Sequence, residues 1–277
     1  MRRPSPRWWL RPRRRSADRA VGNEPNLNIG ITNPRVQRLR RLVGRRSSRS
    51  EEGVVVVEGP VLIAEAVAAG WTFECQFVAP GADPVTGAGE VLALAEGVID
   101  KVASTETPQG VIAIAARPES SRELLRTATF VVVADGVADP GNLGTMMRSA
   151  EAAGADLVIV TPGTVDPTSP KTVRSSAGAV FRIPVLEVES LETLRASGLV
   201  VVGTSSHRGI DFARFDVPSR VAVVMGSEAH GLADDVTVDE WVTIPHVGRA
   251  ESLNVAMACT LLCFEVARRR RDASGTV

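Results

Sequence analysis

The stretch FVVVADGVADPGNLGTMMRSAEAAG, residues 130–154, contains a strand, a loop and a helix in that order. The run FVVVAD is apolar without alternation, as expected of a strand buried on both faces of a parallel sheet. The run TMMRSAEAAG is predicted to be a helix that stops at Gly154, since glycine favours the backbone just beyond a helix. The loop between them carries Asn142 and two glycines, and Arg148 follows within the helix. This order predicts an α/β domain with a ligand site at the carboxyl end of the strand.

The two glycines first suggest a phosphate-binding turn, because a glycine-bearing helix N-terminus points free N–H groups at an anion. A dinucleotide site needs the pattern G-x-G-x-x-G and an acidic residue about 20 residues later. Gly141 and Gly144 do not complete that pattern. A nicotinamide-dependent oxidoreductase is therefore disfavoured.

The rest of the second half repeats the alternation of strand and helix. Helices are predicted near 171–179 and at 191–195, and the strands around them are the Val-rich and Ile-rich runs DLVIV, RIPVLEV, LVVVGT and VAVVMG. Strands of this kind that alternate with helices indicate a parallel sheet covered on both faces.

The first half is predicted to be a smaller α/β domain at residues 29–116. Its expected elements are strands at 54–57, 73–79, 98–103 and 111–116 and helices at 58–70 and 90–97. The polar residues 117–127 are the predicted linker to a second domain at 128–271, which a tail at 272–277 follows. With 277 residues, 44% of them apolar, the chain can supply two cores.

Composition places the protein in the cytoplasm. No run of about 18 apolar residues occurs, so no membrane association is expected, and prolines and arginines stand where a secretory signal needs an apolar segment. The odd number of cysteines, three, indicates reduced thiols. Cys259 and Cys263 have a spacing that could suit two metal ligands, but no His or carboxylate cluster completes a site. Core packing is the preferred interpretation, and no metal is predicted.

The net charge of zero conceals an asymmetry. The first 50 residues hold 15 arginines and two acidic residues, whereas the remainder is acidic. A basic end on an acidic protein is typical of a polyanion binder. Residues 1–28 are predicted to be a disordered leader. From Pro34 the apolar Val36, Leu39 and Val43 have helical spacing, and the candidate polyanion contacts on the other faces of this basic helix are Arg35, Arg38, Arg41, Arg45 and Arg46.

Three stretches, the first of which overlaps the one quoted above, occur in a characteristic order: GNLGTMMRSAEAAGA at 141–155, VMGSEAHGL at 224–232 and IPHVGRAESLNVAMA at 244–258. Together they closely resemble the three motifs of the SpoU-type, or TrmH-like, RNA ribose 2′-O-methyltransferases of the SPOUT superfamily. One departure is His246, where relatives often have methionine. The runs NPRVQRLRRLVGRR, VEGPVLIAEAV and TPQGVIAIA also make the first domain similar to that family's L30e/L7Ae-like α/β RNA-binding domain.

The resemblance implies a C-terminal SPOUT domain with a deep trefoil knot, a topology that general rules of chain connection would exclude. It also implies a homodimer, because the family builds its active site at a two-fold interface. S-adenosyl-L-methionine would be held by three loops, which map here to Thr204, to Gly226 and to the segment from Ile244 to Leu253. A glycine there is expected to let the chain approach the adenosine closely.

The resemblance also assigns roles around the methylated ribose. Asn142 would orient the nucleotide, and Arg148 would activate the hydroxyl. Because a guanidinium is protonated and has no acceptor, we expect Arg148 to clamp a phosphate and stabilise the developing alkoxide. A surface pair between Arg148 and Glu151 is the structural alternative.

The remaining candidates carry a structural alternative as well. Glu228 would accept a hydrogen bond or a proton, or else cap a helix start near Ala229. Ser252 and Asn254 open the last helix, with Ser252 as the expected N-cap. Lys171 and Arg174 are candidate RNA contacts, with a helix-end salt bridge as the alternative.

The sequence thus predicts an S-adenosyl-L-methionine-dependent 2′-O-methyltransferase whose partner is RNA. Ribosomal RNA, 23S in particular, is the first choice of substrate and tRNA the second. The competing function is that of a non-catalytic RNA-binding protein that retains the fold. Loss of motif residues would favour it, but Asn142, Arg148, Glu228, Ser252 and Asn254 are all present.

Overall fold

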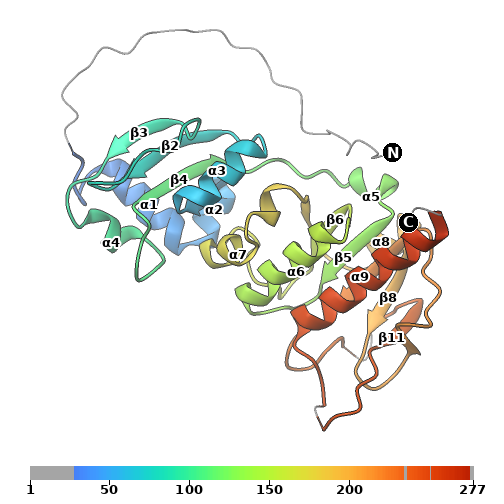
Figure 1. Ribbon diagram of the computed structural model, residues 1–277. Coiled ribbons are helices and arrows are strands. Elements are labelled where there is room, and N and C mark those ends of the chain that lie inside the picture. The colour runs from blue at the N-terminus through green and yellow to red at the C-terminus, as the bar shows by residue number, and fades with distance from the viewer. Residues whose placement is uncertain (1–27, 234–235, 250, 275–277) are drawn as a thin grey trace.

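The computed structural model describes residues 28–233, 236–249 and 251–274, and it shows two α/β domains side by side (Figure 1). The leader predicted at 1–28 lies, apart from residue 28, outside the described residues. Within the described part of the chain, no helix has the length and apolar character that crossing a membrane requires.

The N-terminal domain is built on a four-stranded sheet in the order β1-β4-β2-β3. Strand β4 is antiparallel to both of its neighbours, and β2 and β3 are parallel. The elements in chain order are α1 (Pro34–Gly44), α2 (Arg46–Glu52), β1 (Val54–Glu58), α3 (Pro60–Ala68), β2 (Phe73–Val78), β3 (Glu90–Ala93), α4 (Val98–Val102) and β4 (Val111–Ala116).

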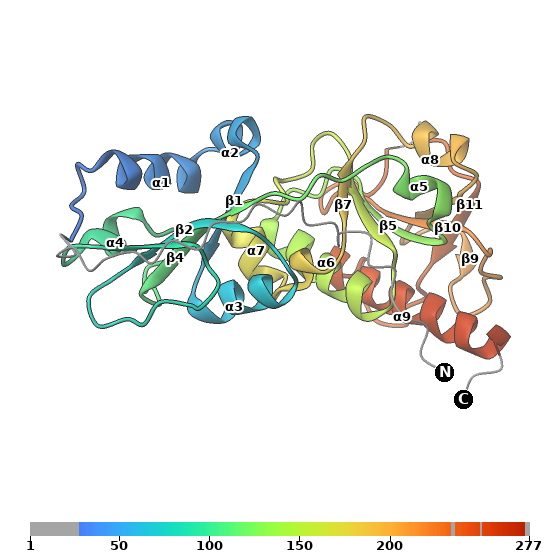
Figure 2. The ribbon, with the colours of Figure 1, turned by 90° about the horizontal axis from the view of Figure 1, so that it is seen from above.

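Alternate residues of β1 serve two different cores, because successive side chains of a strand point to opposite faces. Val54 and Val56 pack with α1 and α4 on one face, where the buried helix residues are Val36, Leu39 and Leu42. Val55 and Val57 pack with α3 on the other face. Figure 2 shows α1 and α2 on one side of this sheet and α3 on the other.

Two predicted elements of the N-terminal domain have the wrong secondary structure, a helix in place of a strand and a strand in place of a helix. The run at 90–97 was expected to be a helix, but its first residues form β3, which pairs with β2. The run at 98–103 was expected to be a strand and forms α4. Gly97, with φ of 68°, turns the chain between them, and α4 then buries Val98, Ile99 and Val102. Short apolar runs suit either structure, and here the sheet partner decides.

Two smaller expectations about the basic helix are also wrong. The chain turns at Arg45, where the backbone is extended, and continues as α2, which the sequence reading missed. Leu42 is fully buried, whereas Val43 is only partly buried.

The C-terminal domain is built on a seven-stranded parallel sheet in the order β7-β6-β5-β10-β8-β11-β9. This confirms the predicted fold class. The elements are α5 (Leu124–Thr127), β5 (Phe130–Ala134), α6 (Pro140–Ala152), β6 (Leu157–Val160), α7 (Pro170–Ser175), the 3₁₀ turn η1 (Ala179–Phe181), β7 (Val185–Glu187), α8 (Glu192–Ala196), β8 (Val200–Thr204), β9 (Ile210–Asp211), β10 (Val221–Met225), β11 (Glu240–Thr243) and α9 (Val255–Ser274).

Helices cover both faces of this sheet, as the continuous Val and Ile runs predict. In β5, Phe130 and Val132 pack toward α6, α7 and α9, while Val131 and Val133 pack toward α5 and α8. The short strand β11 was not predicted. The trefoil knot stays a prediction, because strand order and pairing do not describe how the chain is threaded.

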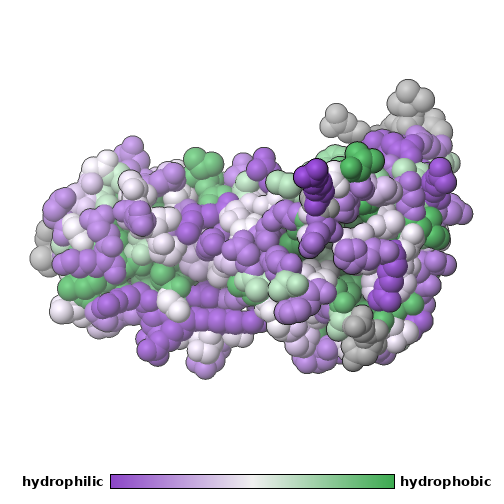
Figure 3. Space-filling view, turned by 90° about the horizontal axis from the view of Figure 1, so that it is seen from below, coloured by the Kyte–Doolittle hydropathy of each residue, from purple (hydrophilic) through white to green (hydrophobic). Residues whose placement is uncertain are grey.

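The two domains share one hydrophobic core. Val55 and Val57 of β1 belong to the same cluster of buried side chains as Val173 of α7 and Val180 of η1. The space-filling view shows the two halves of the molecule in contact, with polar side chains spread over the junction (Figure 3). The polar linker therefore joins two domains that are packed against each other.

Candidate functional site

A cavity of about 700 Å³ opens at the carboxyl ends of β8 and β10. This position is where parallel α/β sheets bind ligands, and the volume lies within the range of about 300–1,000 Å³ that is usual for small-molecule sites. All four predicted cofactor residues line the cavity: Thr204, Gly226, Ile244 and Leu253. Glu228, Ser252 and Asn254 line it as well.

The two glycines of the first motif are explained by packing. Helix α6 begins after Asp139, whose side chain accepts a hydrogen bond from the N–H of Asn142. A Cβ on Gly141 would lie 2.6 Å from the carboxylate of Asp139. A Cβ on Gly144 would lie 2.5 Å from the Cβ of Ser175 and 2.7 Å from the carbonyl oxygen of Thr172. Gly144 therefore lets α6 approach α7 closely.

Gly226 is likewise required by the chain itself. A Cβ there would lie 2.2 Å from the carbonyl carbon of Gly231 and 2.3 Å from the backbone nitrogen of Leu232. Close approach of two backbone segments is by itself enough to require glycine here, and the expected approach to the adenosine stays a prediction. Gly226 still lines the cavity.

A chain of hydrogen bonds joins the three motifs at the cavity edge. Asn142 donates through Nδ2 to Oε1 of Glu228 at 2.9 Å. Its Oδ1 accepts from Nδ2 of Asn254 at 3.0 Å. Asn254 in turn accepts through Oδ1 from the N–H groups of Ala256 and Met257. Residues more than 80 positions apart in the sequence thus form one polar unit.

The direction of this chain follows from its two ends. An ionised carboxylate can only accept hydrogen bonds, and backbone N–H groups can only donate. Glu228 therefore fixes which way the Asn142 amide points, and the first turn of α9 fixes the Asn254 amide. Asn142 can donate to Glu228 and accept from Asn254 at the same time in only one orientation of its amide, so these two hydrogen bonds hold Asn142 in that orientation.

Glu228 is held in its ionised form. Burial works to raise the pKa of its carboxyl, but hydrogen bonds from Asn142 and from the N–H groups of Ala138 and Asp139 outweigh burial and keep that pKa below its usual range. Such a carboxylate is a weak base. Glu228 is therefore better suited to positioning Asn142 than to taking a proton.

Two expectations about helix caps are wrong. Ser252 does not cap α9, which begins at Val255 with Asn254 as the side chain that accepts from its first N–H groups. No helix starts near Ala229, where a turn between Ser227 and Gly231 is found instead. Glu228 accepts from the backbone just before α6, so its carboxylate faces the positive end of that helix.

Arg148 lies on α6, and its side chain is exposed. The alternative pair with Glu151 is not formed, and Glu151 instead accepts from Arg182 at 3.1 Å. The side chain of Arg148 makes no hydrogen bond or ion pair with another residue that the structure describes. Its charge is therefore available to an anion from solvent.

The predicted RNA contacts on α7 are both ion-paired. Lys171 lies 3.2 Å from the carboxylate of Asp139, beside the start of α6. Arg174 bonds to Glu58 at 3.2 Å and to Ser104, both in the N-terminal domain. The salt-bridge alternative is thus realised for both residues, between domains for Arg174 and at the start of α6 for Lys171.

Most arginines of the basic helix are paired with carboxylates too. Arg35 bonds Glu90, Arg38 bonds Glu52 and Glu74, Arg41 bonds Glu52, and Arg46 bonds Glu187. Arg45 is exposed and has no such bond to any other described residue. The positive potential of this face is therefore lower than the count of arginines suggests.

Sequence reading missed two side chains at the cavity. Arg208 stacks on the ring of Trp241 with its guanidinium carbon 3.8 Å from the ring centre, and both residues line the cavity. Trp241 belongs to β11, the strand that was not predicted. An isolated Trp after a polar segment carries no periodic signal, so nothing in the sequence marked it.

Comparisons with known proteins cover both domains. Residues 129–264 match the model of the SpoU rRNA Methylase family, and residues 33–113 match that of the MRM3-like substrate binding domain. The chain is 38% identical over 178 residues to the 23S rRNA (guanosine(2553)-2′-O)-methyltransferase RlmP of Bacillus subtilis, covering 62% of this chain and 71% of that protein. It is 32% identical over 264 residues to a 23S rRNA (uridine(2479)-2′-O)-methyltransferase of Streptomyces viridochromogenes, covering 87% and 92%.

Solved structures agree with these matches over nearly the whole chain. The SpoU methyltransferase AviRb from Streptomyces viridochromogenes, in complex with AdoMet, superposes with a TM-score of 0.77 at 32% identity and covers 86% of this chain and 98% of that one. An AdoMet-bound rRNA methyltransferase from Sinorhizobium meliloti superposes with a TM-score of 0.76 at 34% identity, covering 88% and 97%. With its three motifs joined at one cavity, this chain belongs to the SpoU rRNA methylase family of RNA methyltransferases.

Proposed function

We propose that this protein transfers a methyl group from S-adenosyl-L-methionine to the 2′-hydroxyl of one ribose in 23S ribosomal RNA. The observation that carries the proposal is the hydrogen-bonded unit of Glu228, Asn142 and Asn254 at the edge of the cavity. The named relatives from Bacillus subtilis and Streptomyces viridochromogenes act on 23S rRNA, which favours ribosomal RNA over tRNA.

The cavity fits the cofactor in chemistry as well as in size. Ile244 and Leu253 supply apolar walls, and backbone groups of the Thr204 and Gly226 loops supply hydrogen-bonding partners. S-adenosyl-L-methionine provides a methyl sulfonium, an electrophile that the protein side chains lack.

The chain's own residues act on the RNA. Asn142 is held in one orientation by Glu228 and Asn254 and would position the nucleotide. Arg148 would bind the phosphate next to the reacting ribose, and its charge would stabilise the oxygen as the hydroxyl proton leaves to solvent. Exposed Ser252 would contact the same nucleotide from the cavity wall.

We also propose that the protein is a cytoplasmic homodimer. One side of α9, with Leu253 just before it, exposes apolar side chains whose exposed fractions are 37% for Leu253, 64% for Met257, 44% for Leu261 and 46% for Phe264. Large apolar side chains grouped on one face are typical of an interface, and this one starts at the cavity. A Met257→Asp and Phe264→Asp double variant should be monomeric in sedimentation, whereas the wild type should be a dimer.

The proposed reaction is tested by incubating the protein with labelled S-adenosyl-L-methionine and unmodified 23S rRNA, then mapping 2′-O-methyl groups. The proposal requires a single methylated ribose and no product with Asn142→Ala. Methyl transfer to tRNA but not to 23S rRNA would show that tRNA is the substrate. RNA binding without transfer would instead support the non-catalytic alternative.

A further inference from the structure

We propose that Arg49 is a positioning residue. It locks the N-terminal domain onto the methyltransferase domain and thereby fixes which ribose reaches the site. This inference rests on the proposed function, in which the first domain contacts RNA and the second transfers the methyl group. A rigid junction sets the span between these two places, so a nucleotide at the wrong distance cannot react.

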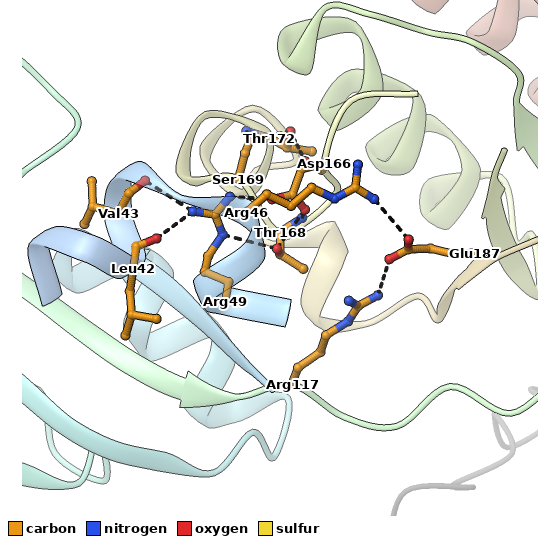
Figure 4. A network of polar contacts seen from close by, with 10 residues as sticks. All are labelled: Leu42, Val43, Arg46, Arg49, Arg117, Asp166, Thr168, Ser169, Thr172 and Glu187. Atoms are coloured by element: carbon orange, nitrogen blue, oxygen red, sulfur yellow. Dashed lines mark hydrogen bonds and ion pairs between the residues drawn. The ribbon is translucent and has the colours of Figure 1, made fainter. Parts of the chain in front are cut away.

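Arg49 is a buried arginine at the domain boundary, 4% exposed. Its Nη1 donates to the carbonyl oxygens of Leu42 at 2.6 Å and Val43 at 3.2 Å, near the end of α1. Its Nη2 donates to Asp166 and its Nε to Thr168 at 3.4 Å, both in the C-terminal domain (Figure 4). One guanidinium thus caps a helix of one domain and binds a carboxylate of the other.

The chemistry of this contact favours rigidity. A buried charge is tolerated only when it is paired and hydrogen-bonded. Arg49 and Asp166 can satisfy each other only while the domains are together. Asp166 is itself oriented by hydrogen bonds from the N–H and hydroxyl of Thr168, each at 2.8 Å. Opening the junction would break this ion pair and the hydrogen bond from Arg49 to Thr168, so these contacts favour the closed junction.

Further contacts surround this one, all to the same segment of the C-terminal domain, residues 166–187. Glu187 binds Arg46 of α2 and Arg117 of the linker, each at 3.0 Å (Figure 4). The indole N–H of Trp71 donates to the carbonyl oxygen of Phe181 at 3.1 Å. The segment is therefore held from several directions, which a single hinge would not allow.

The same segment also reaches the methyl-transfer site. Helix α7 lies within it, and Lys171 of α7 bonds Asp139, the N-cap of α6. Because Gly144 lets α6 contact α7 backbone to backbone, the helix that carries Asn142 and Arg148 cannot move independently of α7. The path from Arg49 to the reacting ribose thus runs through closely packed elements.

The inference is tested with the double variant Arg49→Met and Asp166→Asn, which removes both charges so that neither is left buried alone. Arg49→Lys is a second variant that keeps the charge but not the planar fork that reaches both domains. The matched control is Arg126→Met, which removes an exposed arginine of the linker region whose one ion-pair partner within the described part of the chain is Glu123.

The first measurement is the distance distribution between spin labels introduced by Asp100→Cys on α4 and Glu192→Cys on α8, both exposed positions. The native cysteines are buried. The wild type and the control should give one narrow distribution. The double variant should give a broad one, and Arg49→Lys an intermediate one. A narrow distribution in the double variant would overturn the inference.

The second measurement is the map of methylated riboses in 23S rRNA. In the double variant the rate at the native ribose should fall by about 10-fold to 100-fold, since a misplacement of about 1 Å has costs of this order, and neighbouring riboses should gain methyl groups. The affinity for S-adenosyl-L-methionine should not change. Unchanged selectivity despite a broad distribution would refute Arg49 as a positioning residue. If the wild type methylates no RNA, the proposed function is wrong, and the label distances still decide the rigidity of the junction.

Discussion

At the scale of single residues, the exposed side chain of Arg148 bears most directly on the proposed methyl transfer. Exposed on α6 and without a partner among the described residues, it has the freedom to bind a phosphate. A guanidinium binds phosphate through two parallel hydrogen bonds, a geometry that an ammonium cannot reproduce.

We expect Arg148→Lys and Arg148→Ala to bind S-adenosyl-L-methionine normally and to lose methyl transfer by about 100-fold or more, as for one lost preorganised contact. Single-turnover methylation across pH is the measurement. If Arg148 were instead a general base, the lysine variant should recover activity as the pH rises toward the pKa of lysine. Full activity in the alanine variant would exclude both roles.

Glu228→Gln tests the direction of the hydrogen-bond chain. A glutamine amide has one acceptor oxygen, so either the N–H of Ala138 or the Asn142 amide meets a donor in place of an acceptor. If the Asn142 amide turned in response, the Asn254 amide would have to turn as well and would present its own N–H groups to those of α9. We expect methyl transfer to fall by about 10-fold to 100-fold, since the misplacement of a positioning group has costs of this order. Near-normal affinity for S-adenosyl-L-methionine is the control, and an unaltered rate would show that the orientation of Asn142 is not needed.

At the scale of elements, the contact between α6 and α7 depends on one glycine. Gly144→Ala introduces a Cβ that meets the backbone of α7, and overpacking of this kind costs about 1–3 kcal/mol. The gain in helix propensity, about 1 kcal/mol, does not offset the larger part of that range. Gly44→Ala, at a helical glycine with nothing within 4 Å of its Cβ, is the control and should not destabilise. Denaturant unfolding of the two variants distinguishes these outcomes.

Elements were predictable where burial on both faces imposes one pattern. The strands β5, β6, β7, β8 and β10 of the C-terminal sheet and the helix after β5 follow directly from runs of Val, Ile, Leu and Ala. The exchange of strand and helix at 90–103 was not predictable, because a few apolar residues fit either period and the choice depends on the partner strand β2. Gly226 was expected to face a ligand and Gly144 was given no role, since backbone packing between distant segments leaves no local pattern.

The candidate site, too, was predictable from the sequence only in part. The residues of the three motifs were identified by resemblance. Glu228, Ser252 and Asn254 line the cavity, and hydrogen bonds join Asn142 to two of them, whereas Arg148 is not among the lining residues. Their connections, such as Asn254 rather than Ser252 at the start of α9, depend on which side chains meet in space. The ion pairs of the basic helix could not be foreseen either, because their carboxylates lie up to 141 positions away in the sequence.

At the scale of the whole molecule, the Arg49–Asp166 pair should make the stability of the domain junction depend on pH. Burial works to raise the pKa of Asp166, but hydrogen bonds from Arg49 and Thr168 outweigh it and lower that pKa below its usual range. The other charged side chains of this network are Arg46, Arg117 and Glu187.

A lowered folded-state pKa means that the pair contributes fully above the unfolded value of about 3.9 and loses its contribution as the pH falls through the folded value. The wild type should therefore lose more stability between about pH 5 and pH 2 than the Arg49→Met and Asp166→Asn double variant. Urea unfolding at several pH values measures the difference. Equal losses of stability in the two proteins would mean that the ionisation of Asp166 does not contribute to the stability of the junction.

The core that runs through both domains also determines how the chain can fold. Val55, Val57 and Ala115 of the first sheet are buried together with Val173 and Val180 of the second domain, so each half would expose part of its buried apolar surface if the other were removed. We therefore expect the two domains to unfold together in a single calorimetric transition. Separate expression of either half would expose an apolar face and favour aggregation. The free energy of unfolding is therefore expected to belong to the two domains jointly.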